Sequence, residues 1–249
     1  ICIAVFLRLV GLVVAADGVR SASREALELG QKPRFLGQVA WRALVPTATL
    51  SDPLPPGAHV FTGPGRHLVA YPLRQGQVWN VVAVAAARAW AEESWHVTSD
   101  AGEMRACFAG FGAPVQALLQ SAQSPILWGL FGHQPLDRWS KGRVVWLGDA
   151  CHPMLPFMAQ GATMAIEDAW VLADALDREP LDHALESYEA RRKPRTTRVQ
   201  RLSARNAWIY HAPPPFSWPI HLGMGAVARS PGGLARSLDW LYGADVTSG

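Results

Sequence analysis

The residues best placed to do chemistry gather around one carboxylate, Asp149, which follows a short apolar run at residues 144–147. A run of this length and β-branched character is typical of a buried strand. After a loop that contains Pro153, helical spacing of apolar residues begins at Gly161. A carboxylate at a strand end can accept hydrogen bonds from sugar-like hydroxyls, and a helix N-terminus attracts a partly anionic group. This order of elements therefore predicts a ligand site, because ligands of open α/β sheets bind at such strand ends.

A second chemical pair is His67 and Tyr71, which alternate with Leu68 and Ala70 and so project from one face of a predicted strand. An imidazole and a phenol on one face can orient an aromatic substrate, accept its phenolic proton or hydrogen-bond its carboxylate. By spacing alone the simpler interpretation is favoured, in which His67 lies at a strand edge and Tyr71 only packs.

The elements that must position these residues are predicted from periodicity and turn residues. A buried strand over residues 10–16 ends at Asp17-Gly18, and Ser21 or Ser23 can cap the helix that follows. From residue 35 the pattern changes to short runs of β character between Pro/Gly turns, which predicts an antiparallel sheet in a second module. The predicted strands cover residues 39–45, 58–61, 67–72, 78–85 and 126–131, and helical spacing covers residues 104–111 and 115–119.

Past Asp177 the pattern predicts an amphipathic helix with one apolar side and one basic stripe. A single basic helix without interleaved aromatics is usually a solvated face, so nucleic-acid binding is not expected. The stripe consists of Arg191, Arg195, Arg198, Arg201 and Arg205.

The composition suits a soluble, well-buried α/β protein. The chain has 249 residues, of which 49% are hydrophobic and 17% charged, with a formal net charge of +3. Its three cysteines are too few for a disulfide scaffold and lack metal-ligand spacing, so no metal site is predicted and a cytoplasmic location is the default.

The N-terminal stretch of residues 1–16 is strongly apolar, but Arg8 interrupts it and it is shorter than a bilayer span. No small-residue cleavage site follows a basic start, so neither a signal peptide nor a membrane role is expected. The chain lacks an initiator Met and opens within the apolar run, which favours a fragment or a late gene start.

The run Gly148-Asp-Ala-Cys-His-Pro, followed by Pro156, Gln160-Gly161 and Ile166-Glu-Asp-Ala, resembles the GD motif of single-component FAD-dependent aromatic hydroxylases. That family includes salicylate hydroxylase, 6-hydroxynicotinate monooxygenase and p-hydroxybenzoate hydroxylase. The resemblance implies that Asp149 holds the ribityl hydroxyls of the flavin and that the helix start at Gly161 faces the pyrimidine edge. It also assigns Gly148, Pro156, Gln160 and Ala162 to the cofactor site.

The segment Ala16-Asp-Gly-Val-Arg-Ser resembles the family's DG motif, which lies near the flavin pyrophosphate and the nicotinamide cofactor. Asp17, Gly18 and Arg20 are then cofactor-binding candidates, and Arg20 and Arg24 are candidate phosphate partners. The pair His67 and Tyr71 matches the family's His-x-x-x-Tyr at the substrate pocket, which implies a catalytic role for both.

The family's G-x-G-x-x-G turn, which receives the ADP pyrophosphate, has no acceptable match in this sequence. The near match at residues 223–228 follows prolines rather than a strand, so it is rejected. We therefore expect an α/β (α+β) fold with a partial FAD-binding Rossmann-like domain, an inserted antiparallel substrate domain and C-terminal helices. The expected boundaries are 1–34 and 136–180 for the FAD-binding part, 35–135 for the substrate module and 181–249 for the C-terminal helix and tail.

The resemblance implies hydroxylation of an aromatic acid or phenol through a flavin hydroperoxide, with FAD as cofactor and NADH or NADPH and molecular oxygen as co-substrates. This stretch alone is expected to be inactive, because half of the dinucleotide site is missing. A homodimer is compatible with the resemblance. The alternatives are a non-catalytic fragment or binding module, and a flavin-dependent epoxidase of an apolar polyene.

Overall fold

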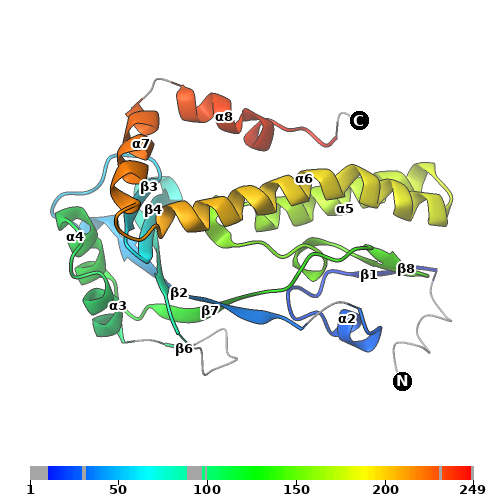
Figure 1. Ribbon diagram of the computed structural model, residues 1–249, viewed down its shortest axis with the longest axis horizontal. Coiled ribbons are helices and arrows are strands. Elements are labelled where there is room, and N and C mark those ends of the chain that lie inside the picture. Colours follow the sequence, from blue (N-terminus) through cyan, green and yellow to red (C-terminus); the bar gives the residue numbers. More distant parts are fainter. Residues whose placement is uncertain (1–10, 30–31, 89–96, 99, 230–231, 248–249) are drawn as a thin grey trace. The chain divides into compact units, whose positions relative to one another are not determined.

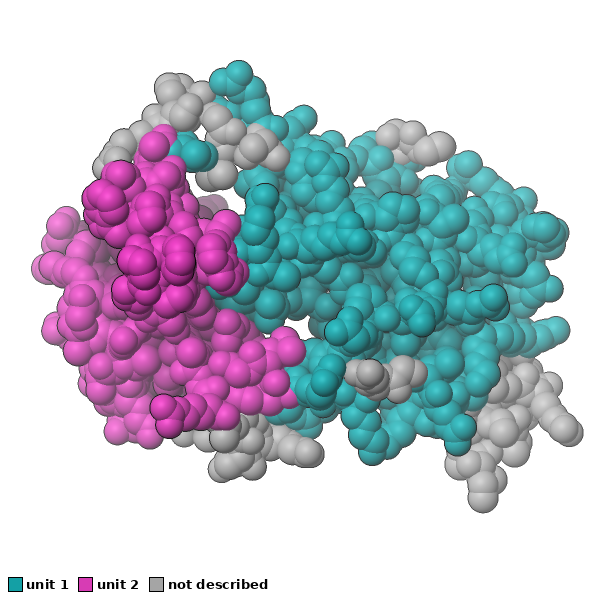
Figure 2. Space-filling model, in the orientation of Figure 1, with its two compact units in different colours: residues 1–34, 131–207, 227–249 teal, residues 35–130, 208–226 magenta. Residues whose placement is uncertain are grey.

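The computed structural model describes residues 11–29, 32–88, 97–98, 100–229 and 232–247. The chain divides into two compact units (Figure 2). Unit 1 comprises residues 1–34, 131–207 and 227–249, and unit 2 comprises residues 35–130 and 208–226. Each unit therefore contains segments that are distant in the sequence.

Unit 1 contains a three-stranded sheet with the order β1-β9-β8 (Figure 1). Strand β1 (Val13–Ala15) runs parallel to β9 (Val144–Trp146), and β8 (Ser140–Lys141) is antiparallel to β9. All three residues of β9 are buried, as the continuous apolar run predicts for a central strand. The predicted strands at residues 10–16 and 144–147 are confirmed, although β1 is shorter than expected within the described residues.

Helix α5 (Gly161–Arg178) and helix α6 (Leu181–Tyr210) lie side by side along this sheet (Figure 1). The buried apolar face of α5 recurs at helical spacing, and Pro180 follows the helix end at Glu179. Two shorter helices complete the unit, α2 (Ala22–Ala26) and α8 (Gly233–Tyr242). The core under the helices includes Trp139, Trp146, Leu147, Cys151, Leu172 and Tyr188.

Unit 2 is built on a six-stranded sheet with the order β3-β4-β5-β2-β7-β6. The strands are β2 (Arg34–Pro46), β3 (His59–Gly63), β4 (Arg66–Leu73), β5 (Val78–Ala86), β6 (Val97–Thr98) and β7 (Ile126–Gly132). Strand β4 pairs antiparallel with both β3 and β5, and β5 pairs antiparallel with β2. The predicted antiparallel sheet is confirmed.

Helices α3 (Ala101–Cys107) and α4 (Ala113–Ser121) cover the sheet of unit 2 and close its core. That core contains Trp41, Leu68, Trp79, Met104, Phe108 and Leu118. Helix α7 (Ser217–Arg229) contains the rejected glycine-rich match at residues 223–228, so this stretch is helical rather than a strand-to-helix turn. Among the described residues, no helix is both long and apolar enough to cross a membrane.

Candidate functional site

The turn after β9 is a 3₁₀ turn (Gly148–Ala150) whose backbone depends on Gly148. Gly148 has a φ of +60°, and a Cβ added there would lie 2.9 Å from the Cβ of Ala165 on α5. The amides of Cys151 and His152 both donate to the Gly148 carbonyl, at 3.0 and 2.9 Å. Glycine is therefore required both by the left-handed backbone and by the close packing of α5 on the turn.

Asp149 projects from this turn with an exposed carboxylate. Among the described residues its oxygens have no hydrogen-bond partner, although surrounding protein raises its pKa through desolvation, an effect that nearby His152 opposes. A Cβ added at Gly161 would lie 3.9 Å from Asp149 Oδ1. The carboxylate and the first turn of α5 are thus neighbours, as the sequence predicts.

The start of α5 carries unsatisfied polar groups. Its N-cap residue, Gln160, forms no side-chain cap, so the first amides of the helix receive no bond from it. Gln160 is 95% buried, yet its Oε1 has no partner among the described residues. The preceding loop runs through a short 3₁₀ helix (Pro156–Met158) and reaches the cap through Ala159, which has a φ of +51°. Pro156 and Ala162 are exposed beside this helix start.

The segment after β1 is held by its own hydrogen bonds. Burial raises the pKa of Asp17, but hydrogen bonds from the Ser23 amide and hydroxyl and from Ser21 outweigh it, so the pKa lies below its usual value. Ser21 caps α2 by accepting from the Arg24 amide, which confirms the predicted cap. Gly18 has a φ of +75° and Arg20 is exposed, with its guanidinium 5.1 Å from the Phe131 ring centre.

Arg24 ties this segment to the turn that carries Asp149. Its guanidinium is 97% buried and donates to the carbonyls of Val19 and Ala150, each at 3.1 Å. It also contacts Nε2 of His133, whose Nδ1 donates to the Gln134 carbonyl at 2.6 Å. Burial lowers the pKa of His133 to about 4, which suits a neutral ring that accepts from Arg24. The expectation that Arg24 binds phosphate is corrected, because its donors are used inside the protein.

In unit 2, His67 and Tyr71 lie on one strand, β4, as predicted. His67 is 99% buried, and its Nδ1 lies 2.7 Å from Nε2 of His211. Nδ1 of His211 lies 3.1 Å from the Gln38 amide nitrogen. Burial, with a smaller contribution from His211, lowers the pKa of His67 to about 3, and burial lowers that of His211 to about 4. The two histidines are therefore neutral near pH 7; Tyr71 is half-buried.

No sequence pattern indicated His133, His211 or Gln38, because each becomes important only through contacts with residues distant in the sequence. The expectation that the whole basic stripe is solvated is also corrected. Arg195 forms a two-point bond with Glu167 at 2.8 Å for each contact, and Arg198 stacks 3.7 Å from the Trp240 ring centre.

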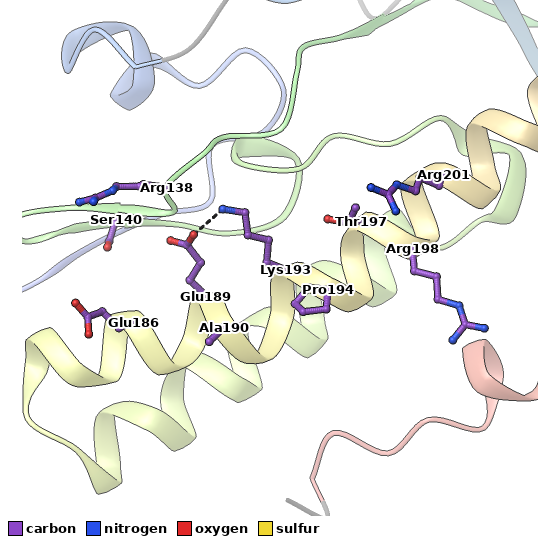
Figure 3. Close-up of a pocket in the computed structure, with 10 residues that line it drawn as sticks. All are labelled: Arg138, Ser140, Glu186, Glu189, Ala190, Lys193, Pro194, Thr197, Arg198 and Arg201. Atoms are coloured by element: carbon purple, nitrogen blue, oxygen red, sulfur yellow. Dashed lines mark hydrogen bonds and ion pairs between the residues drawn. The ribbon is translucent and has the colours of Figure 1, made fainter.

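A separate groove of about 830 Å³ lies along α6 in unit 1 (Figure 3). Figure 3 shows the Lys193 ammonium directed at Glu189, a contact of 2.7 Å. None of the residues predicted to bind cofactor or substrate lines this groove. Its lining consists of Arg138, Ser140, Glu186, Glu189, Ala190, Lys193, Pro194, Thr197, Arg198 and Arg201.

Comparison with known sequences gives a consistent set of relatives. A family profile described as an FAD binding domain matches residues 11–203. A 3-amino-4-hydroxybenzoate 2-monooxygenase of Streptomyces platensis is 41% identical over 210 residues, which is 82% of this chain and 52% of that protein. A 6-hydroxynicotinate 3-monooxygenase of Bordetella bronchiseptica is 42% identical over 204 residues, covering 80% of this chain and 53% of the relative.

Solved structures agree with the sequence relatives. A salicylate hydroxylase in complex with its substrate matches with a TM-score of 0.80 and 28% identity, covering 95% of this chain and 62% of that one. The Klebsiella pneumoniae protein HpxO, complexed with FAD and uric acid, matches with a TM-score of 0.69 and 29% identity, covering 81% of this chain and 52% of that one. The chain spans about half the length of the curated relatives named above. By the profile match over residues 11–203, the chain belongs to the FAD-binding domain family, and it is similar in sequence and fold to the aromatic monooxygenases and the salicylate hydroxylase named above.

Proposed function

We propose that this chain supplies the flavin-ring and substrate portion of an FAD-dependent monooxygenase that hydroxylates an aromatic acid or phenol. NADH or NADPH and molecular oxygen would be its co-substrates. The observation that carries the proposal is the exposed carboxylate of Asp149, which has no hydrogen-bond partner within the part of the chain that the structure describes. It lies beside the N-terminus of α5, where Gln160 forms no side-chain cap. Family membership supports FAD-dependent hydroxylation as the reaction class. The geometry around Asp149 supports binding of the flavin ring as the task of this chain.

The residues around Asp149 fit a flavin in three respects. The carboxylate can accept hydrogen bonds from ribityl hydroxyls. An anionic phosphate has no such donors to offer a carboxylate. The first amides of α5 and the helix field favour a ring edge that carries partial negative charge. The buried Oε1 of Gln160, which has no partner in the described ranges of the chain, offers an acceptor for a ring N–H. We therefore assign Asp149, Gln160, Gly161 and Ala162 to the flavin ring and its ribityl chain.

When bound, FAD would supply the redox chemistry, that is, the capacity to accept a hydride and to activate oxygen. The tasks of the protein are to orient the ring, exclude water and hold the substrate. Gly148 permits the left-handed turn after β9, and Pro156 restricts the backbone of the loop before α5. Asp17, Gly18 and exposed Arg20 extend the proposed cofactor site along the segment after β1, where Arg20 has the charge needed to contact a phosphate.

His67 and Tyr71 are proposed to hold the aromatic substrate. With the Gln38 amide nitrogen donating to Nδ1 of His211, the proton of His211 lies on Nε2 and is donated to Nδ1 of His67. His67 then carries its own proton on Nε2, as a neutral donor. Such a donor can hydrogen-bond a carboxylate or a phenolate oxygen without introducing a buried charge.

The substrate class is narrowed by the relatives. Four of the relatives are named for 3-amino-4-hydroxybenzoate, 6-hydroxynicotinate, 3-hydroxybenzoate and salicylate. Each of these compounds is an aromatic ring bearing both a carboxylate and a hydroxyl. We therefore propose a hydroxylated aromatic carboxylate as the substrate of this chain's site.

The proposal is tested by joining the chain to the N-terminal half of the Bordetella relative and assaying NADH and NADPH oxidation with a panel of hydroxylated aromatic acids. We expect a yellow protein whose nicotinamide oxidation is stimulated by at least one of these acids. His67→Gln and Tyr71→Phe should raise the KM for that acid without releasing flavin. A colourless protein would favour a non-catalytic module, and turnover of an apolar polyene alone would favour an epoxidase.

A further inference from the structure

One buried carboxylate, Asp168, contacts the turn of Asp149 at both of its ends. Oδ2 of Asp168 accepts the Gly148 amide at 3.0 Å and Nε2–H of His152 at 2.5 Å. Gly148 and His152 flank Asp149, and both Asp168 and His152 are at least 99% buried. The contact joins α5 to the loop between β9 and α5, so it fixes the turn against the helix whose N-terminus lies beside it.

Asp168 is kept ionised by a buried guanidinium. Nε of Arg192 on α6 donates to its Oδ1 at 2.7 Å, and Arg192 is 99% buried. Burial by itself raises the pKa of Asp168, but hydrogen bonds and charge from His152 and Arg192 outweigh it, so the pKa lies below its usual value. As a carboxylate, Asp168 can accept from all three donors at once, which a protonated or amide side chain cannot do.

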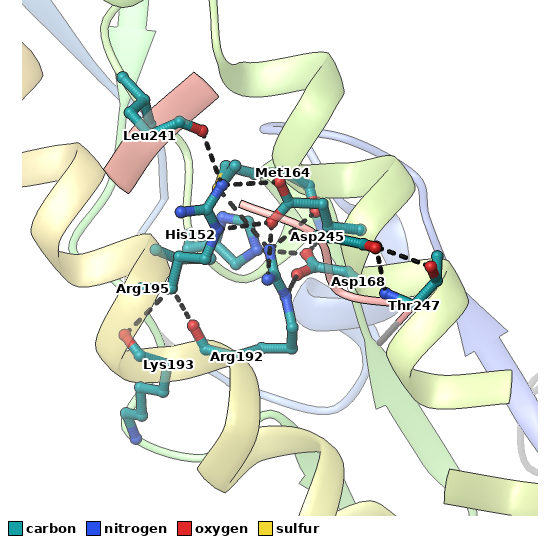
Figure 4. A network of polar contacts seen from close by, with 12 residues as sticks. His152, Met164, Asp168, Arg192, Lys193, Arg195, Leu241, Asp245 and Thr247 are labelled. Carbon is teal, nitrogen blue, oxygen red and sulfur yellow. Dashed lines mark hydrogen bonds and ion pairs between the residues drawn. The ribbon is translucent and has the colours of Figure 1, made fainter. Parts of the chain in front are cut away.

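The network continues to the C-terminal helix. Arg192 also bonds Glu167 at 2.7 Å, and Glu167 receives Arg195 through both carboxylate oxygens. Arg195 donates in turn to the carbonyls of Trp240 and Leu241 on α8, at 2.9 and 3.0 Å. Figure 4 shows His152 and Arg192 converging on Asp168, with Arg195 reaching toward Leu241. Three helices of unit 1, α5, α6 and α8, therefore contribute to the network that holds the turn.

We infer that Asp168 is a positioning residue for flavin binding: it fixes the backbone of residues 148–152 so that Asp149 presents its carboxylate to the ribityl chain. This inference rests on the proposed function. Asp168 touches no ligand itself, and its effect is transmitted through the Gly148 amide and the His152 ring. A displacement of about 1 Å at a functional group lowers activity by up to about a hundredfold, so loss of the Asp168 contacts should have a measurable effect.

The test measures the affinity of the chain for FMN and FAD by flavin fluorescence, together with hydrogen exchange of the amides in residues 148–152. Asp168→Asn cannot accept from all three donors, so we expect the Kd for FMN to rise by about tenfold or more and exchange at Gly148 to accelerate. Asp174→Asn is the matched control on the same helix. Asp174 also pairs with two arginines, Arg178 and Arg191, but it does not contact the turn.

A second pair of variants keeps the test valid if Asp168→Asn folds poorly. His152→Gln places an amide donor near the position of Nε2 and should retain flavin affinity, whereas His152→Leu removes the donor and should lower it. Equal affinities for these two variants, or an Asp168→Asn variant that melts earlier yet keeps its Kd, would overturn the positioning role.

The two proposals fail in different ways. If the wild-type chain binds neither FMN nor FAD, the proposed function falls and the inference falls with it. If flavin binds and Asp149→Ala weakens binding while Asp168→Asn does not, only the positioning role of Asp168 is overturned.

Discussion

The histidines of unit 2 determine how stability responds to pH at the scale of single residues. The pKa of His67 is about 3 in the folded protein, against an unfolded value of about 6.5. Between these values the unfolded chain binds more protons, so stability is full above about pH 6.5 and falls as the pH decreases toward the folded pKa. Each such histidine contributes a slope of about 1.4 kcal/mol per pH unit in that window.

We predict that His67→Gln makes the pH dependence of unfolding shallower below about pH 6.5, because glutamine does not titrate and can still bond His211. Urea denaturation followed by circular dichroism, between about pH 7.5 and about pH 5, measures this slope. His183→Gln, at an exposed position on α6, is the control and should leave the slope unchanged. An identical slope in wild type and His67→Gln would show that His67 is not held neutral.

Single residues also mark the limit of what sequence can predict. Asp149 was predicted because its position follows from a strand end and a motif, both of which are local. Arg192 was not, because the phase of α6 against α5 decides which arginine is buried, and only the packed structure sets that phase. For the same reason, the sequence could not indicate that His152 bonds Asp168.

The strand-turn-helix unit is the element on which the flavin site depends, and its tightest point is Gly148. We predict that Gly148→Ala lowers flavin affinity and also costs about 1–3 kcal/mol of stability, since it adds a clash with Ala165 to the strain of a positive φ. Thermal melting and FMN titration measure the two effects.

Gly142 provides the control for Gly148. It has a φ of +57°, but an added Cβ would meet nothing within 4 Å. Gly142→Ala should therefore show the strain alone, with unchanged FMN affinity. Equal flavin affinity in the two variants would mean that close packing of α5 on the turn does not matter for binding.

Helix α6 illustrates how an element predicted correctly can have an unpredicted task. Its amphipathic character follows from the sequence, but its polar side chains also hold the loop before α5. Gln200 and buried Ser203 donate to the carbonyls of Pro153 and Leu155, at 2.9 and 2.6 Å. These bonds join side chains to backbone about fifty residues away, so periodicity could not indicate them.

At the scale of the whole molecule, the fold class was expected from the β and helical patterns together with the resemblance to FAD-dependent aromatic hydroxylases, and the comparisons confirm it. The discontinuous units did not follow: residues 208–226 group with unit 2, whereas residues 227–249 group with unit 1. These two segments have similar helical patterns. Long-range contacts decide which unit each segment joins, and local sequence patterns carry no information about such contacts.

The set of motifs in the whole chain also predicts which part of FAD the chain recognises. These 249 residues contain an expected ribityl and ring site but no acceptable G-x-G-x-x-G turn for the pyrophosphate. We therefore predict that the chain alone binds FMN and FAD with Kd values within about threefold of each other. Joined to the N-terminal half of the Bordetella relative, it should prefer FAD by about tenfold or more. A strong FAD preference in the chain alone would contradict this prediction.

The most direct measurement of the central claim is the Kd for FMN of the wild-type chain and of Asp149→Ala. Asp177→Ala, which changes an exposed aspartate at the far end of α5, serves as the control. Loss of charge-assisted hydrogen bonds is worth about 1.5–3 kcal/mol, so Asp149→Ala should raise the Kd by about tenfold to a hundredfold while Asp177→Ala leaves it unchanged. An Asp149→Ala variant that binds FMN as tightly as the wild type would contradict the assignment of this carboxylate to the flavin.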